Sequence, residues 1–249
     1  MTVQELEKKL SSYLRVAEIR ENALNGLQVG NIKAEVNTIS FAVDACQLAI
    51  AESIKANADT LIVHHGLFWG TQSAIRDTLY DRIRLLIENN ITLLAYHIPL
   101  DMHPEIGNNI QIARHIGLNN IQNFGDYHGM NVGFRGVLPE SMKIKQIADL
   151  LPESMNKNVK ILPYGREMIQ SIAVISGGYA KGVYEAITEN IDLYITGEGQ
   201  YDVYHTIRES QINVIYAGHY ETETIGIMAL KKWIENEYNL KTVYIEEEY

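Results

Sequence analysis

The chain has 249 residues and a mass of 28.2 kDa, which suits one large domain or two interleaved ones. Its formal net charge of −10 disfavours nucleic acid as a partner, because phosphate contacts need a basic face. Cys46 is the single cysteine, so neither an intramolecular disulfide nor a cysteine-based zinc finger is available. We therefore expect a reducing, cytoplasmic location. No apolar run is long enough to span a bilayer, which predicts no membrane association.

Helices and strands are expected to alternate along most of the chain. Thr2 and Glu5 have capping-box spacing ahead of apolar residues at helical intervals, which predicts a first helix and not a signal segment. The elements expected next are a strand at 39–43, a helix at 45–57, a strand ending at His64, a helix capped by Thr78 and running to Glu88, and a strand at 91–96. The middle of the chain predicts strands at 132–138 and 159–162, with a helix after Pro139.

From Ile172 the first pattern starts again. Residues 192–199 parallel residues 59–66, and residues 212–216 stand where 91–96 stood. We interpret this as an internal duplication of a βαβαβ unit, the alternative being chance similarity between two α/β segments. The predicted fold class is therefore α/β with an internally duplicated βαβαβ unit.

The carboxyl ends of the expected strands carry the residues with metal-binding or acid–base chemistry. In an open α/β sheet, ligands bind outside these ends. Here they carry His64 and His65, the segment from His97 to Asp101, Gly197 with Glu198, and Gly218 with His219. The sequence therefore predicts a polar site assembled from several strand ends.

Two pairs of residues favour a metal site. Neighbouring side chains of a strand point to opposite faces, so His64 and His65 serve one site only where the chain turns, as Gly66 permits. The alternative is one core histidine and one exposed histidine. His219 and Glu223, at i and i+4, project from one face of a helical turn, although such pairs are also common on solvated helices. Imidazole and carboxylate ligands suit zinc, iron, manganese or nickel better than calcium, and two such ions could activate a water for hydrolysis.

Five motifs in chain order resemble those of the NIF-three-like family, whose members are called GTP cyclohydrolase I type 2 homologues. The motifs are residues 26–30, 63–66, 99–101 with 107–109, 195–198, and 218–219 with 222–223. The resemblance runs from the first helix to the last, and the middle segment is its least distinctive part.

The resemblance implies one family domain over residues 1–249, made of two intertwined α/β lobes. Lobe one would be approximately 1–125 plus 210–249, and lobe two approximately 126–209. The resemblance also implies a toroidal homohexamer and a dinuclear metal centre with two divalent ions per subunit. By position, the ligands would be His64, His65, Asp101, His219 and Glu223, with no departure from the family at those five.

Other candidates have alternative roles that the sequence leaves open. His97 could transfer a proton or orient a ligand, or it could simply pack. Glu198 could be a general base or could cap the next helix. Residues 176–178 could cradle a phosphate with backbone N–H groups, but no lysine follows at Walker-A spacing. We expect surface or packing roles for the remaining histidines, which are His103, His115, His128 and His205.

Two functions from different classes follow. One is a metal-dependent hydrolase acting on a nucleotide or related small molecule, with His97 and Glu198 as candidate catalytic residues. The other is a metal-binding scaffold or regulatory interaction protein without turnover. Five ligands for two ions leave coordination positions for water or substrate, which favours catalysis because structural sites close their coordination sphere. DNA threading through a ring is disfavoured by the acidic charge.

Overall fold

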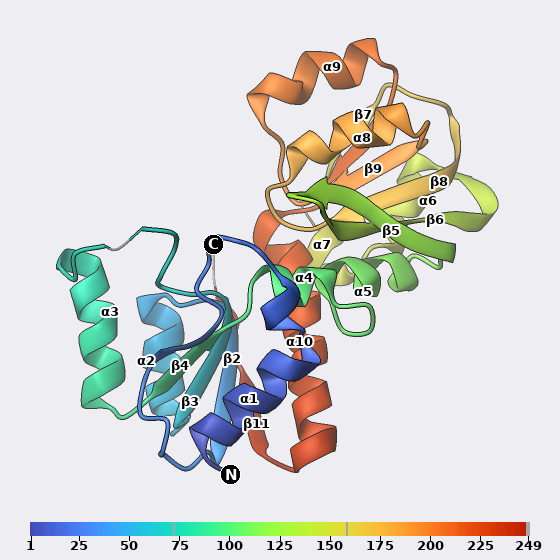
Figure 1. Cartoon of the computed structure of the whole chain (residues 1–249). Coiled ribbons are helices and arrows are strands. Elements are labelled where there is room, and N and C mark those ends of the chain that lie inside the picture. Colours follow the sequence, from blue (N-terminus) through green and yellow to red (C-terminus); the bar gives the residue numbers. More distant parts are fainter. Residues whose placement is uncertain (72, 158, 248–249) are drawn as a thin grey trace. The chain divides into compact units, whose positions relative to one another are not determined.

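The computed structural model describes the whole chain except residues 72, 158 and 248–249. The chain forms two compact units, one comprising 1–100 with 227–249 and the other 101–226 (Figure 1). Each unit holds one β-sheet with helices, which confirms the predicted α/β class. Within the described part of the chain, no helix is long and apolar enough to cross a membrane.

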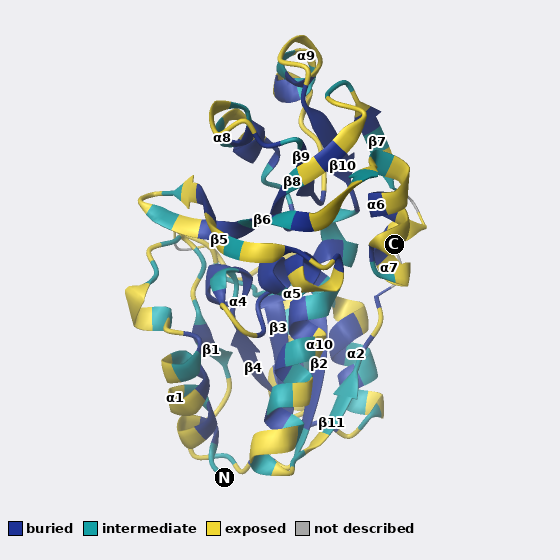
Figure 2. Cartoon of the chain, turned by 90° about the vertical axis from the view of Figure 1, so that its right-hand side faces the viewer, coloured by how far each residue is buried: buried dark blue, intermediate teal, exposed yellow. Residues whose placement is uncertain are grey.

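The first unit is built on a five-stranded sheet in the order β1–β4–β3–β2–β11. Its three central strands run parallel and are almost entirely buried (Figure 2). Helices α2 and α3 join them as crossovers and lie on one face of the sheet (Figure 1). The elements of this unit are α1 (Val3–Tyr13), the 3-10 helix η1 (Val16–Glu18), β1 (Gly26–Val29), β2 (Thr38–Asp44), α2 (Gln47–Lys55), β3 (Thr60–His65), α3 (Asp77–Glu88), β4 (Thr92–Ala95), most of α10 (His219–Tyr238) and β11 (Lys241–Tyr244).

The second unit is built on a six-stranded sheet in the order β5–β6–β8–β9–β10–β7. Apolar residues of α5 and α6 pack on one face of this sheet and form the core with β8, β9 and β10. Its elements include α5 (Asn108–His115), β5 (Asn119–Tyr127), β6 (Met130–Lys143), α6 (Ile144–Leu150), α7 (Glu153–Asn156), β7 (Lys160–Pro163), β8 (Met168–Ile175), η2 (Ala180–Gly182), α8 (Val183–Thr188), β9 (Leu193–Thr196), η3 (Tyr201–Val203), α9 (Tyr204–Glu209) and β10 (Asn213–Tyr216). The chain passes between the units within α4 (Ile98–Met102) and within α10.

The two sheets share a repeated core, which confirms the predicted duplication. The run β8–α8–β9–α9–β10 repeats β2–α2–β3–α3–β4, and the parallel strands are neighbours in the same order. In each unit one further strand, β1 or β7, precedes the repeat and pairs antiparallel with its last strand. The repeat therefore has four strands where the sequence indicated three.

Asp59 and Asp192 occupy the same position of the repeat, just before its second parallel strand. Oδ2 of Asp59 accepts hydrogen bonds from the backbone N–H groups of Asn37 and Thr38, at 2.8 and 3.1 Å. Oδ2 of Asp192 accepts from the two backbone N–H groups at the corresponding places in β8, at 3.1 and 3.0 Å. An aspartate at the equivalent position thus links the first parallel strand to the second in each repeat. Chance similarity between two α/β segments does not explain this shared contact.

The boundaries of the units, at 100–101 and 226–227, differ from the lobe boundaries near 125 and 210 that the family resemblance implied. Residues 101–125 group with the second unit because α5 packs on its sheet and β5 pairs with β6. Residues 210–226 do so because β10 lies between β9 and β7. The antiparallel strand β5 was not among the predicted elements.

Two local predictions are wrong. Helix α3 begins at Asp77 and its N-cap residue is Arg76, so Thr78 lies inside the helix and is not its N-cap. The helix expected after Pro139 begins only at Ile144, because β6 continues through the proline. The pairing of β6 with β8 is irregular between Val137 and Met142, so the missing N–H of Pro139 breaks no regular ladder.

We expect Asp59→Ala and Asp192→Ala each to lower the free energy of unfolding by about 2 kcal/mol, because each leaves two backbone N–H groups without their carboxylate acceptor. Urea denaturation followed by circular dichroism measures this change. Asp149→Ala, at an exposed position of α6, is the control and should change stability little. A lower free energy of unfolding in only one of the two variants would contradict the shared structural role of the two aspartates.

Candidate functional site

The first group of candidate residues is His64, His65 and His97, all in the first unit. His64 and His65 end β3, and His97 follows the neighbouring strand β4. One ring nitrogen from each residue lies within 4.8 Å of the others. The rings of His64 and His65 lie 4.6 Å apart, centroid to centroid, so the two successive histidines join one group. The structure also adds His97 to this group, where the sequence left its role open.

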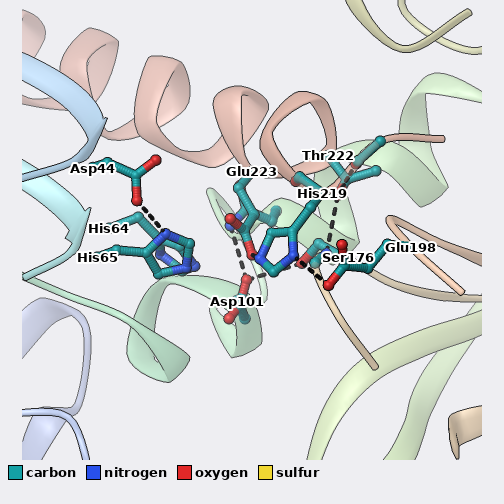
Figure 3. A network of polar contacts seen from close by, with 12 residues as sticks. Asp44, His64, His65, Asp101, Ser176, Glu198, His219, Thr222 and Glu223 are labelled. Atoms are coloured by element: carbon teal, nitrogen blue, oxygen red, sulfur yellow. Dashed lines mark hydrogen bonds and ion pairs between the residues drawn. The ribbon is translucent and has the colours of Figure 1, made fainter. Parts of the chain in front are cut away.

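Each of these three imidazoles has its Nδ1 atom on an oxygen acceptor. The pairs are His64 with the carbonyl oxygen of Tyr96 at 3.1 Å, His65 with Asp44 at 2.9 Å (Figure 3), and His97 with Glu21 at 2.5 Å. Because a carbonyl or carboxylate oxygen only accepts, Nδ1 carries the proton in each neutral ring and the lone pair lies on Nε2. Metal-binding histidines have this arrangement, in which the second nitrogen donates to an oxygen.

Glu21 and Asn25 position His97, although neither belongs to a motif identified in the sequence. Glu21 Oε1 accepts hydrogen bonds from Asn25 Nδ2 and from the backbone N–H of Ile98, while Asn25 Oδ1 accepts from the backbone N–H of His97. Burial raises the pKa of Glu21, but the hydrogen bond and charge of His97 and the other donors outweigh it and lower that pKa overall. The sequence feature that could have pointed to this pair is the four-residue spacing of Glu21 and Asn25, just ahead of the motif at 26–30.

The second group is Glu198, His219 and Glu223, all in the second unit (Figure 3). His219 and Glu223 lie at i and i+4 in the first turns of α10, as the spacing predicted, and His219 Nε2 is 3.2 Å from Glu223 Oε1. His219 Nδ1 is 3.1 Å from Glu198 Oε1. The hydrogen bond to Glu223 is the largest of the interactions that raise the pKa of His219 to about 9, burial opposes it, and Glu198 adds to the rise. Two carboxylates thus surround a positive charge.

Glu198 does not cap the next helix. The residue before η3 is Gln200, and no side chain caps that helix. Glu198 instead lies two residues after the end of β9, with its side chain 57% exposed, and reaches His219. The helix-capping alternative is therefore wrong, and the contact with His219 leaves an acid–base role as the one to test.

Asp101 is oriented by a network of hydrogen bonds within the second unit (Figure 3). Its Oδ1 accepts from Asn108 Nδ2 at 2.8 Å and from Ser176 Oγ at 2.9 Å. Asn108 Oδ1 accepts from the backbone N–H of Gly226 in α10, and Asn109 Oδ1 accepts from the backbone N–H of Ser176. The two asparagines of the motif at 107–109 therefore link Asp101 to the end of β8 and to α10.

The phosphate cradle considered at residues 176–178 is contradicted by these contacts. The backbone N–H of Ser176 donates to Asn109, and the N–H of Gly177 donates to Thr222 Oγ1 at 3.0 Å. Both groups are used within the protein. Gly177 has a different role, because its φ is +64° and a Cβ there would overlap Glu223 Oε1 and lie 3.2 Å from His219 Nε2. Glycine at this position leaves room for the second group.

The remaining histidines have surface or packing roles, as expected. Nδ1 of His103 accepts from the backbone N–H groups of Glu105 and Ile106 and stabilises a turn. The other three, which are exposed, are His115, His128 and His205.

Comparison with known proteins agrees with this architecture. The model of the Duf34/NIF3 (NGG1p interacting factor 3) family matches residues 1–248. The chain belongs to this family. A Pyrococcus horikoshii protein named GTP cyclohydrolase 1 type 2 homolog is 39% identical over 247 residues, which cover 99% of this chain and 98% of that protein. The resemblance found in the sequence motifs is thus confirmed.

Solved structures show the same fold. A crystal structure of a Thermus thermophilus protein has a TM-score of 0.91 at 33% identity and covers 100% of this chain and 99% of that one. The protein ybgI, described as being of unknown function, has a TM-score of 0.93 at 31% identity with the same coverage.

Gly177→Ala should displace the Glu223 carboxylate and so bring the pKa of His219 from about 9 toward its ordinary 6.5 in the metal-free protein. A pH titration of the imidazole proton signals by NMR measures this. Gly129→Ala is a matched control, because Gly129 also has a positive φ, +83°, but a Cβ there meets nothing within 4 Å. An unchanged His219 pKa in Gly177→Ala would contradict the assigned role of the glycine.

The raised pKa of His219 also predicts how stability depends on pH in metal-free protein. Because the folded pKa exceeds the unfolded 6.5, the stabilisation is fully present below pH 6.5 and is lost as the pH rises through about 9. The side chain of His219 is 39% exposed, so solvent screening reduces its contribution to the free energy of unfolding to about 1 kcal/mol. Urea denaturation of wild type and His219→Gln should show a difference below pH 6.5 that shrinks above pH 9. His205→Gln, at an exposed position, should show no such trend.

Proposed function

We propose that this protein is a metal-dependent hydrolase that binds two divalent ions through His64, His65, Asp101, His219 and Glu223. Its substrate is a nucleotide or related small molecule. The observation that carries the proposal is the common orientation of the imidazoles in the first group, each with Nδ1 on an oxygen acceptor, so that the lone pair of each neutral ring lies on Nε2.

The second group fits a cation as well. Glu198 and Glu223 surround the positive charge of His219, and a metal ion can take the place of that proton. Asp101 is held by two hydrogen-bond donors on one oxygen, as ligating carboxylates commonly are. Nitrogen and carboxylate donors together suit zinc, iron, manganese or nickel. Bound ions of this kind polarise a substrate oxygen and lower the pKa of water.

We assign proton transfer to His97 and Glu198. Glu21 fixes the proton of His97 on Nδ1, so Nε2 is the atom that accepts a proton. Glu198 is a half-exposed carboxylate, which can exchange protons with solvent. The nucleotide class is supported by the name of the Pyrococcus horikoshii relative, which refers to a GTP cyclohydrolase.

The alternative is a metal-binding scaffold or regulatory protein without turnover, because the same donors suit a structural ion. A toroidal homohexamer and a cytoplasmic location remain predictions of the family resemblance and of the single cysteine, respectively.

His65→Ala and Glu223→Ala should each lose bound metal while staying folded, because each removes a ligand. Elemental analysis of purified protein should give about two equivalents of metal per chain for wild type and less for both variants. The matched controls are His115→Ala and Glu237→Ala, an exposed histidine and an exposed glutamate of α10, which should keep the wild-type metal content. Full metal occupancy in both ligand variants would refute the assignment.

Hydrolysis of nucleotides and phosphoesters is then screened with the same proteins and the identified metal. Activity in wild type that is lost in both variants would establish the hydrolase. Metal at two equivalents without any activity would favour the scaffold.

A further inference from the structure

Trp69 lies beside His65 and His97 of the first group and is 43% exposed. Its ring centroid is 4.9 Å from that of His97, with the ring planes at 77°, and 6.0 Å from that of His65. In an edge-to-face contact at most one face of the indole is occupied. Trp69 therefore offers an apolar aromatic surface next to a group of polar, candidate metal-binding side chains.

The loop that carries Trp69 is held in place on both sides. Trp69 forms an isolated antiparallel bridge with Ala23. The backbone hydrogen bonds around it run from Leu24 N–H to Phe68 O at 3.0 Å and from Gly70 N–H to Asn22 O at 2.6 Å. The indole Nε1 donates to the carbonyl oxygen of Gly66 at 3.0 Å. The exposure of the ring is therefore a property of an ordered segment.

Gln28 adds a further constraint on the same loop. Its Oε1 accepts from the backbone N–H of Leu67 at 2.6 Å, and its Nε2 donates to the carbonyl oxygen of Leu24, also at 2.6 Å. A Cβ at Gly66 would overlap the Gln28 amide, so glycine at this position lets the two segments approach. The motifs at 26–30 and 63–66 thus cooperate in fixing where the indole lies.

An indole fixed in this way is suited to stacking against a flat ring. Stacking of a nucleobase on an aromatic side chain contributes roughly a tenfold or greater gain in affinity, and it tolerates different bases because every base has a π face. A pre-ordered indole loses little conformational entropy when a ligand binds.

We propose that Trp69 is a stacking platform for a planar nitrogen heterocycle, so that the substrate class of the site is base-containing compounds and not simple phosphoesters. This inference rests on the proposed function, because it takes the adjacent histidines as part of the reaction centre. The alternative cover for the indole is a second copy of the chain, in which case replacing Trp69 would change the oligomeric mass.

The test uses guanosine 5′-monophosphate and ribose 5-phosphate as probes, because they share the sugar phosphate and differ in the base. Isothermal titration calorimetry is done on wild type, Trp69→Leu and Trp69→Phe, each with metal bound and after metal removal. We expect Trp69→Leu to weaken binding of guanosine 5′-monophosphate about tenfold and Trp69→Phe to weaken it less, because phenylalanine keeps a smaller aromatic face. Binding of ribose 5-phosphate and the metal content should stay as in wild type.

A spectroscopic measurement checks that the base contacts Trp69 itself. Trp233, the other tryptophan, stacks on Tyr13 with ring centroids 4.0 Å apart, so Trp233→Phe leaves Trp69 as the single reporter. We expect guanosine 5′-monophosphate, and not ribose 5-phosphate, to quench its fluorescence in a saturable way.

Three results would overturn the inference: no binding of guanosine 5′-monophosphate by wild type at millimolar concentration, equal binding by wild type and Trp69→Leu, or a lower oligomeric mass of Trp69→Leu by light scattering. The last would identify the indole as a contact between copies. Failure of the proposed function is distinguishable from these results. It would appear as absence of bound metal or of hydrolysis in wild type, independently of the result of the binding measurements.

Discussion

Oxygen acceptors at the Nδ1 atoms of His64, His65 and His97 fix which nitrogen of each imidazole carries a lone pair. The rest of the first unit is arranged so that these acceptors are present. Parallel pairing of β2 with β3 brings Asp44 beside His65, and pairing of β3 with β4 brings the carbonyl of Tyr96 to His64. The segment before β1 supplies Glu21. An imidazole without such an acceptor can exchange tautomers, and the group would then lose its common orientation.

The two repeats share contacts that stabilise the fold and differ in the residues that carry the chemistry of the candidate site. Asp59 and Asp192 make the same hydrogen bonds in both repeats, at the amino ends of the strands. At the carboxyl end of the second parallel strand the repeats differ, because Glu198 stands at the position that corresponds to His65. Scaffold contacts are constrained by strand geometry in each copy, whereas strand ends are free to carry different side chains. One fold element thus supplies imidazoles in one unit and a carboxylate in the other.

Glycines have a specific role in the candidate site. Gly66 leaves space for the amide of Gln28, and Gly177 leaves space for the carboxylate of Glu223. In both cases a polar side chain from another part of the sequence occupies the volume that a Cβ would need. The motifs that contain these glycines therefore encode close packing of polar groups as much as backbone flexibility.

The sequence by itself determined the α/β class, the duplication, the capping box of the first helix and the i, i+4 pair of His219 and Glu223. These features depend on residues close together in the chain, where strand and helix periodicities are directly visible. Only the tertiary structure decided that Glu21 orients His97, since 76 positions separate them, and that Glu198 contacts His219 and does not cap a helix. It likewise decided that Trp69 stands exposed beside the imidazoles. Pairings of this kind depend on which strands and loops become neighbours, and no local periodicity specifies that choice.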